Sequence, residues 1–207
     1  MALASSPFGD PVAEPAFWDD SNLRFNEGGC DPWGNLYCGS MAYDRTEGAG
    51  QLFRVSPSGE KTVVLPHVST SNGIAFSPDG TLAYYNDTKL RQTDVFDVID
   101  KRLINRRPFA SSDGASNDGL TVDSEGNIWV AMNRHGKVRL YSPDAEILTE
   151  IQLPVQLVTA CTLGGPDMRT LFITTSRENL EDPEPEAGAV FAVEVDVPGM
   201  PVAEYGG

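Results

Sequence analysis

One motif recurs in this chain at a fixed interval of 46 residues. The copies begin at RFNEGGCDPWGNLYCGSM, SNGIAFSPDGTLAYYND and SNDGLTVDSEGNIWVAM, so Asn26, Asn72 and Asp118 are equally spaced. A weaker fourth copy, TACTLGGPDMRTLFITT, places Thr159 at roughly the equivalent position. Self-similarity at such a period is typical of repeat architectures, and it restricts the possible folds more than any other feature of the sequence.

Each copy has the pattern of short antiparallel strands. A third apolar-polar alternating segment follows each hairpin (QLFRVSP, QTDVFDV, KVRLYSP and AVFAVEV), and two copies continue into a fourth segment, TVVLP or EIQLP. Alternation with a period of two indicates half-buried strands. Turn sequences such as SPDG and DSEG separate them, and no helix with caps is evident. Four strands in about 46 residues is the size of one β-propeller blade.

The sequence therefore predicts an all-β protein, a β-propeller with about four blades. The expected blades cover residues 22–66, 67–113, 114–156 and 157–207. Residues 1–21 are rich in Ala, Pro, Ser and acidic residues and show no evident strand pair, so they are interpreted as an N-terminal arm or remnant. The acidic segment 177–188, which contains prolines, is expected to be a solvated loop.

The repeated position is a candidate ligand site. In a propeller, the innermost strand of each blade lines the central channel, so residues just before these strands would form a ring at one channel mouth. An isolated Asn-Gly pair is most often a turn. Three amides or carboxylates at equivalent positions instead favour a site, and hard divalent cations such as calcium prefer these oxygen ligands.

Charged residues flank the first copy of this position. Arg24 precedes Asn26 by two residues, and Glu27 follows it directly. A cation beside polar groups at one mouth would suit an oxygen-rich anionic or polyhydroxy ligand. A surface ion pair is the competing explanation for Arg24 and Glu27.

Several other functions and sites are disfavoured. His67 is expected in a loop between blades and His135 in a turn, both away from the repeated position, so a mechanism based on histidine is disfavoured. No GxSxG motif of a serine hydrolase occurs. Asp87 is expected to be a structural turn carboxylate, and Trp33 and Trp129 are expected to pack between strands.

Charge and composition limit the partners and the compartment. The 15 Lys and Arg against 30 Asp and Glu give a net charge of −15, which disfavours nucleic acid and membrane partners. The first residues have no basic region and no long apolar run, so no signal peptide is expected. No apolar run reaches the roughly 20 residues that span a bilayer. We therefore expect a soluble cytoplasmic protein. Cys30, Cys38 and Cys161 are expected to be reduced, with Cys30 opposite Leu36 in a hairpin.

The motifs also resemble a known family. RFNEGG, DPWGNLYCGSM, SNGIAFSPDG, DGLTVDSEGNIWVAM and TACTLGGPDMRTLFITT, in this order, are similar to the senescence marker protein (regucalcin)/gluconolactonase/luciferin-regenerating enzyme family. The likeness extends from about Leu23 to Gly206. It implies a six-bladed propeller with one divalent cation at the channel mouth, and often a sugar-lactone hydrolase.

The resemblance also implies roles for particular residues. Asn72 and Asp118 match the family's metal ligands, with calcium expected first and zinc, manganese or magnesium as alternatives. Arg24 and Asn26 match its substrate-contacting residues. Glu27 stands where the family has an aspartate, and Asp44 falls near a further acidic contact. Family members begin with two more blades and a glutamate ligand, and nothing in residues 1–21 matches them.

The sequence thus predicts a divalent-metal-dependent hydrolase that acts on a small-molecule sugar lactone. In this hypothesis the cation polarises the lactone carbonyl, and Asp118 acts as a base or orients water. The alternative is a non-catalytic propeller that binds a metal or a partner and is inactive because the N-terminal glutamate ligand is missing.

Overall fold

The computed structural model describes residues 2–3, 10, 12–13 and 15–206. Four antiparallel sheets dominate this part of the chain, and a single turn of 3₁₀ helix, η1 (Thr88–Leu90), is its one helical element. No helix in the described residues is long and apolar enough to cross a membrane.

The four sheets follow one another along the chain. The first contains β3 (Leu23–Cys30), β4 (Leu36–Ala42), β5 (Gly50–Val55) and β6 (Lys61–Val68). The second contains β7 (Ser71–Phe76), β8 (Leu82–Asp87), β9 (Gln92–Ile99) and β10 (Arg102–Ser111). The third contains β11 (Ser116–Val122), β12 (Ile128–Asn133), β13 (Lys137–Tyr141) and β14 (Ile147–Gln152). The fourth contains β15 (Val158–Gly164), β16 (Thr170–Thr175) and β17 (Val190–Glu194).

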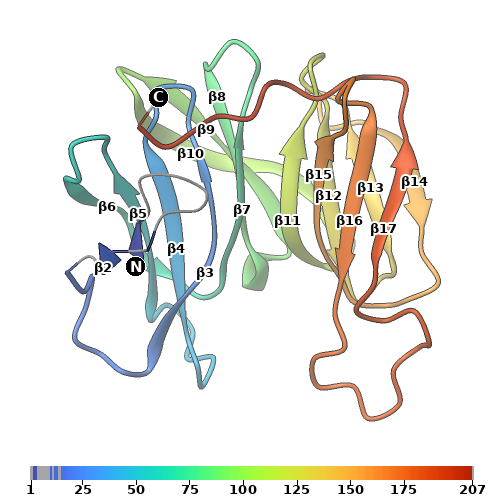
Figure 1. Cartoon of the computed structure of the whole chain (residues 1–207), viewed down its shortest axis with the longest axis horizontal. Coiled ribbons are helices and arrows are strands. Elements are labelled where there is room, and N and C mark those ends of the chain that lie inside the picture. The colour runs from blue at the N-terminus through green and yellow to red at the C-terminus, as the bar shows by residue number, and fades with distance from the viewer. Residues whose placement is uncertain (1, 4–9, 11, 14, 207) are drawn as a thin grey trace.

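The sheets are the blades of a propeller. In each sheet every strand pairs with the next along the chain, and the first strands, β3, β7, β11 and β15, lie side by side at the centre (Figure 1). This arrangement confirms the predicted four blades, of which the last has three strands in the described residues. The six blades that the family resemblance implies are not present in this part of the chain.

Two local predictions were wrong, and one strand was not predicted. His67 lies within β6, which ends at Val68, and not in a loop between blades. The second blade has a fourth strand, β10, which the sequence pattern did not reveal. Residues 1–21 contain a strand pair, because β1 (Ala2–Leu3) is antiparallel to β2 (Val12–Ala13).

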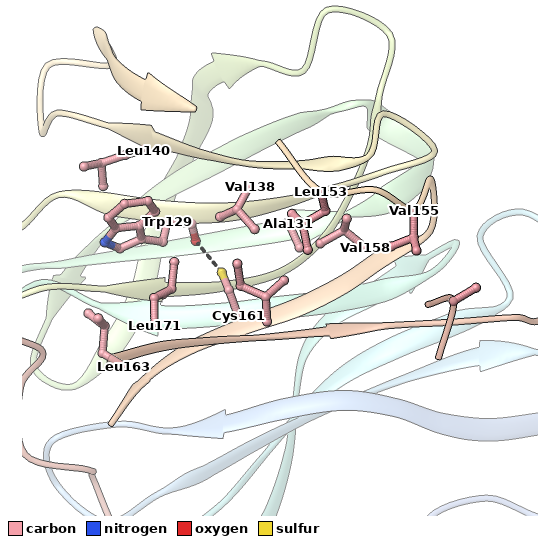
Figure 2. Packing of buried hydrophobic residues seen from close by; sticks show 12 residues of the cluster. Trp129, Ala131, Val138, Leu140, Leu153, Val155, Val158, Cys161, Leu163 and Leu171 are labelled. Carbon is pink, nitrogen blue, oxygen red and sulfur yellow. Dashed lines mark hydrogen bonds between the residues drawn. The ribbon is translucent and has the colours of Figure 1, made fainter. Parts of the chain in front are cut away.

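The blades pack through buried apolar side chains. Between the third and fourth blades, Trp129 and Leu140 face Cys161 and Leu171 (Figure 2). The Cys161 thiol donates to the Trp129 carbonyl oxygen at 3.5 Å. Trp129 is 4% exposed, so its predicted packing role is confirmed. Complementary apolar faces of this kind hold neighbouring blades at a fixed angle.

The predicted roles of the cysteines and of Asp87 are confirmed. All three cysteines are free, and Cys30 pairs with Leu36 across the first hairpin. The Asp87 carboxylate accepts hydrogen bonds from the backbone N–H groups of Ser69 and Thr70, at 3.0 and 2.9 Å. Asp87 therefore fixes the connection between the first two blades, as a structural turn residue does.

Segments from both ends of the chain meet on the first blade. Phe17 and Trp18 pack against Phe25 and Phe53 on the blade face that is turned away from the second blade. The segment after β17 runs back across the inner strands, and its Tyr205 hydroxyl donates to the Ser56 carbonyl oxygen at 2.8 Å (Figure 1). The outer face of the first blade is thus covered by the chain itself.

Candidate active site

The repeated polar residues lie at β-bulges inside the innermost strands. The pairing of β7 with β8 shifts register around Asn72 and Gly73, and that of β11 with β12 shifts around Asp118 and Gly119. A similar shift in β3 falls at Asn26. The prediction that these residues precede the strands is therefore corrected. A bulge re-aims a side chain that regular pleating would direct elsewhere.

The glycines after Asn72 and Asp118 allow the inner strands to approach closely. A Cβ atom on Gly73 would lie 2.5 Å from the backbone nitrogen of Leu120, and one on Gly119 would lie 2.7 Å from the Ala160 Cβ. Real side chains do not tolerate such contacts. Each Asn-Gly or Asp-Gly pair thus places a polar side chain in the inner strand beside a glycine that packs closely on the next blade.

A pocket of about 160 Å³ lies at this end of the inner strands. Four predicted site residues line it together: Arg24, Asn26, Asn72 and Asp118. The structure therefore brings together residues from three blades that the sequence spaces 46 positions apart. Glu27 and Asp44, the other two predicted residues, do not line the pocket.

Asn72 presents a buried oxygen without a partner. Its Nδ2 donates to the Thr88 hydroxyl at 2.8 Å, and that hydroxyl donates to the Asn117 carbonyl oxygen at 2.8 Å. The Asn72 side chain is 3% exposed, and its Oδ1 accepts no hydrogen bond from the described residues. An unsatisfied buried acceptor costs about 1–3 kcal/mol. The orientation of the amide leaves this oxygen available to a ligand.

Asp118 is a carboxylate in a poorly solvated position. Asn133 Nδ2 donates to its Oδ2 at 3.0 Å, and Asn86 Nδ2 donates to its backbone oxygen at 2.7 Å. Burial raises the pKa of Asp118 to about 7, although polar contacts with Asn72 and Asn133 oppose the shift. No Lys or Arg of the described chain forms an ion pair with it.

Glu27 and Asp44 occupy different environments. The Glu27 carboxylate lies deeper between the inner strands, with Oε1 only 3.0 Å from where a Gly119 Cβ would be. Burial, and secondarily the charge of Asp118, raises the pKa of Glu27 to about 8. Asp44 is exposed on the loop after β4, where the Thr46 N–H donates to its Oδ1 at 2.9 Å. This contact lowers the Asp44 pKa.

Two side chains of the pocket present oxygen atoms of the type that a hard divalent cation binds. Asn72 Oδ1 has no hydrogen-bond partner, and the Asp118 carboxylate forms no ion pair with a Lys or Arg of the described residues. Both are oxygen ligands of the type that calcium prefers. No three His, Cys, Asp or Glu side chains gather into a metal site in the described residues. Amide and water oxygens would therefore complete the coordination of a cation held by Asn72 and Asp118.

The sequence pattern did not identify several residues that line the pocket. Arg45 comes from the loop after β4, Arg134 from the turn after β12, and Glu178 and Asn179 from the loop between β16 and β17. None of them occupies the repeated position. The loop 177–188 is largely exposed, as predicted, but its first residues also contribute to the pocket.

The raised pKa values predict how stability depends on pH. Unfolded carboxyls titrate near pH 4, so between about pH 4 and 7 the folded protein binds more protons at Asp118 than the unfolded chain does. The free energy of unfolding at this site should then fall as pH rises, by up to about 1.4 kcal/mol per pH unit.

Urea unfolding at pH 5 and pH 7.5, in chelator, measures this dependence. The fall between the two pH values should be larger in the wild type than in Asp118→Asn, because the amide does not titrate. An equal pH dependence in both proteins would contradict a raised pKa at Asp118.

Comparison with known proteins identifies the family. The family model described as the SMP-30/gluconolactonase/LRE-like region matches residues 6–177. The chain belongs to this family. It is 40% identical, over 186 residues, to a 6-deoxy-6-sulfogluconolactonase from Pseudomonas putida, covering 85% of this chain and 63% of that protein. It is 34% identical, over 194 residues, to a pentonolactonase from Haloferax volcanii, covering 88% of this chain and 66% of that protein.

A solved member of the SMP-30/gluconolactonase/LRE-like family has the same blade arrangement. A regucalcin from Agrobacterium tumefaciens, described as a calcium-binding protein, superposes with a TM-score of 0.91 at 28% identity. The match covers 99% of this chain and 72% of the regucalcin. This chain thus spans roughly two thirds of the length of the relatives that it matches.

Proposed function

We propose that this protein hydrolyses a sugar lactone in the pocket at the mouth of the inner strands, with a bound divalent cation. The main supporting observation is that Asn72, whose buried Oδ1 has no hydrogen-bond partner, and the partly buried Asp118 line the same pocket. Family relatives named as sugar lactonases support the reaction class. The calcium-binding relative makes calcium the first candidate, with zinc, manganese and magnesium as alternatives.

Asp118 is the proposed catalytic base. Because Asn133 occupies its Oδ2, the Oδ1 atom is left to accept a proton from water or to orient that water toward the lactone carbonyl. Without a cation, burial raises the pKa of Asp118 to about 7. A bound divalent cation would favour the ionised carboxylate, which is the form that a base requires. The cation held by Asn72 and Asp118 would supply Lewis-acid polarisation of the carbonyl.

Arg24 and Asn26 are the proposed contacts to the sugar hydroxyls. Asn26 Nδ2 donates to the Ser71 carbonyl oxygen at 2.8 Å, and Arg24 Nη1 donates to Asn26 Oδ1 at 3.0 Å. These bonds hold both side chains against the pocket wall. Glu27 does not line the pocket, so its predicted contact with the substrate stays a prediction. Asp44 would contact only a substrate that extends beyond the rim, so its role stays a prediction.

A thermal melt of metal-stripped protein, with and without calcium, tests the cation site. A ligand that binds only the folded state adds about 2.7 kcal/mol of stability at a hundredfold excess over its dissociation constant. We expect calcium to raise the melting midpoint of the wild type. The shift should disappear in Asp118→Ala and persist in the matched control Asp182→Ala, because Asp182 is an exposed loop carboxylate outside the pocket.

Lactone hydrolysis in a pH-stat, above the spontaneous rate, then decides between the two functions. Calcium-dependent hydrolysis of δ-gluconolactone or a related sugar lactone supports the enzyme. A calcium shift without hydrolysis of any sugar lactone would instead identify a metal-binding module. The absence of both would contradict the cation site as well as the activity.

A further inference from the structure

Three arginines from separate segments line the same small pocket. Arg24 comes from β3, Arg45 from the loop between β4 and β5, and Arg134 from the turn between β12 and β13. The acidic residues in the lining are Asp118 and Glu178, so the lining carries a formal charge of +1. The whole chain carries −15. The pocket is thus a locally basic site on a strongly acidic protein.

Two of these arginines occupy a backbone conformation that favours glycine. Arg45 has a φ of 62° and Arg134 a φ of 67°, both in the left-handed region. Side chains with a Cβ are uncommon there, and glycine adopts it without steric cost. Ten non-glycine residues of the described chain have this conformation, and three of them, Arg45, Arg134 and Asn179, line the pocket. Each arginine therefore projects toward the pocket from a tight turn at some conformational cost.

The guanidinium groups of Arg45 and Arg134 have few partners in the protein. The closest carboxylate to Arg45 is that of Glu178, at 3.8 Å, and both side chains are more than half exposed. Such a pair contributes little. Arg134 forms no ion pair and no side-chain hydrogen bond with the residues that the structure describes. By contrast, one Arg24 nitrogen already donates to Asn26 and to the Phe25 carbonyl oxygen.

We propose that the sugar lactone bound here carries an anionic substituent, a carboxylate, sulfonate or phosphate, which Arg134 and Arg45 recognise at the pocket rim. This inference rests on the proposed lactonase function and adds the substrate class. The planar guanidinium fork matches the oxygens of all three anions and binds them through charge-assisted hydrogen bonds. With the anionic group at the rim, the lactone ring is directed inward toward Asp118 and Asn72.

The test compares two substrates that differ in one charged group. These are δ-gluconolactone and the same lactone phosphorylated on its primary hydroxyl. In the wild type, kcat/KM should be about tenfold higher, or more, for the phosphorylated lactone. In Arg134→Asn this ratio of kcat/KM values should fall by severalfold, with Arg45 still at the rim. Asparagine tolerates positive φ, so this variant is expected to keep its fold.

Arg91→Asn is the matched control. Arg91 is also an exposed arginine in the left-handed region, with a φ of 52°, but it does not line the pocket. The ratio should be unchanged in this variant. An equal loss in Arg91→Asn and Arg134→Asn would overturn the assignment, because it would mean that general surface charge and not the pocket attracts the anion.

Binding of a sugar ring without a lactone bond tests the anion site independently of the lactonase activity. Calorimetry with 1,5-anhydroglucitol and its phosphate ester needs no catalysis. Tighter binding of the ester, lost in Arg134→Asn, supports the anion site even if no lactone is hydrolysed. Equal hydrolysis of both lactones, or equal binding of both rings, would overturn the anion site and leave the lactonase proposal intact.

Discussion

Replacing Asp118 by asparagine is expected to lower lactone hydrolysis by roughly 10²- to 10⁴-fold, the usual contribution of a general base. The amide keeps an oxygen that can face a cation but cannot accept a proton at neutral pH. The loss should therefore persist at calcium concentrations that saturate the variant. Initial rates in a pH-stat, together with the calcium-dependent melting midpoint of the same variant, provide the measurement.

Measuring the rate at saturating calcium distinguishes Asp118 as a catalytic base from Asp118 as a calcium ligand alone. If Asp118 served only as a ligand, excess calcium would restore the rate of Asp118→Asn to within about tenfold of the wild type. That recovery would contradict the proposed base and favour water activation by another group. Asp182→Asn, with the same loss of charge outside the pocket, should keep the wild-type rate.

The largest expected effect on stability comes from Trp129. This side chain is 4% exposed and lies in the apolar cluster between the third and fourth blades. Trp129→Ala should lower the free energy of unfolding by about 3–5 kcal/mol, since it creates a cavity between two sheets. In a chain of this length, the melting midpoint should fall by roughly 6 to 20 °C. Calorimetry or circular dichroism would measure it.

Phe172 offers a control on the other face of the fourth blade. It is adjacent in sequence to the buried Leu171 but is 36% exposed. Phe172→Ala should change stability by no more than about 1 kcal/mol. Equal effects of the two substitutions would contradict the assignment of one blade face to the core. Two separate melting transitions in Trp129→Ala would show that the blades do not unfold as one cooperative unit.

Much of the fold could be predicted because the signal is local and repeated. Strand alternation and turns recur with each copy, so the blades follow from the sequence. The strand β10 was missed because it contains Pro108, directly after the adjacent charged residues Arg106 and Arg107. It pairs only with β9 and shifts register near Pro108, where an edge position tolerates proline.

The pocket residues could be predicted only where they occupy the position that recurs every 46 residues. Asn72 and Asp118 are found from their spacing, because equivalent positions in neighbouring blades must meet at the channel mouth. Arg45, Arg134 and Glu178 come from loops of unequal length, and no periodic pattern indicates which loop residues reach the pocket. Their convergence depends on how the blades pack, which single-sequence patterns do not contain.

The contact between Tyr205 and Ser56 has a consequence for the order of folding. It joins residues 149 positions apart, whereas the strand pairs of each blade are close in sequence. Closing a long loop costs chain entropy before its contact is gained, so local hairpins form first and distant contacts form late. We therefore expect the tail to dock last and to detach first on unfolding, leaving blades that already hold their own strands.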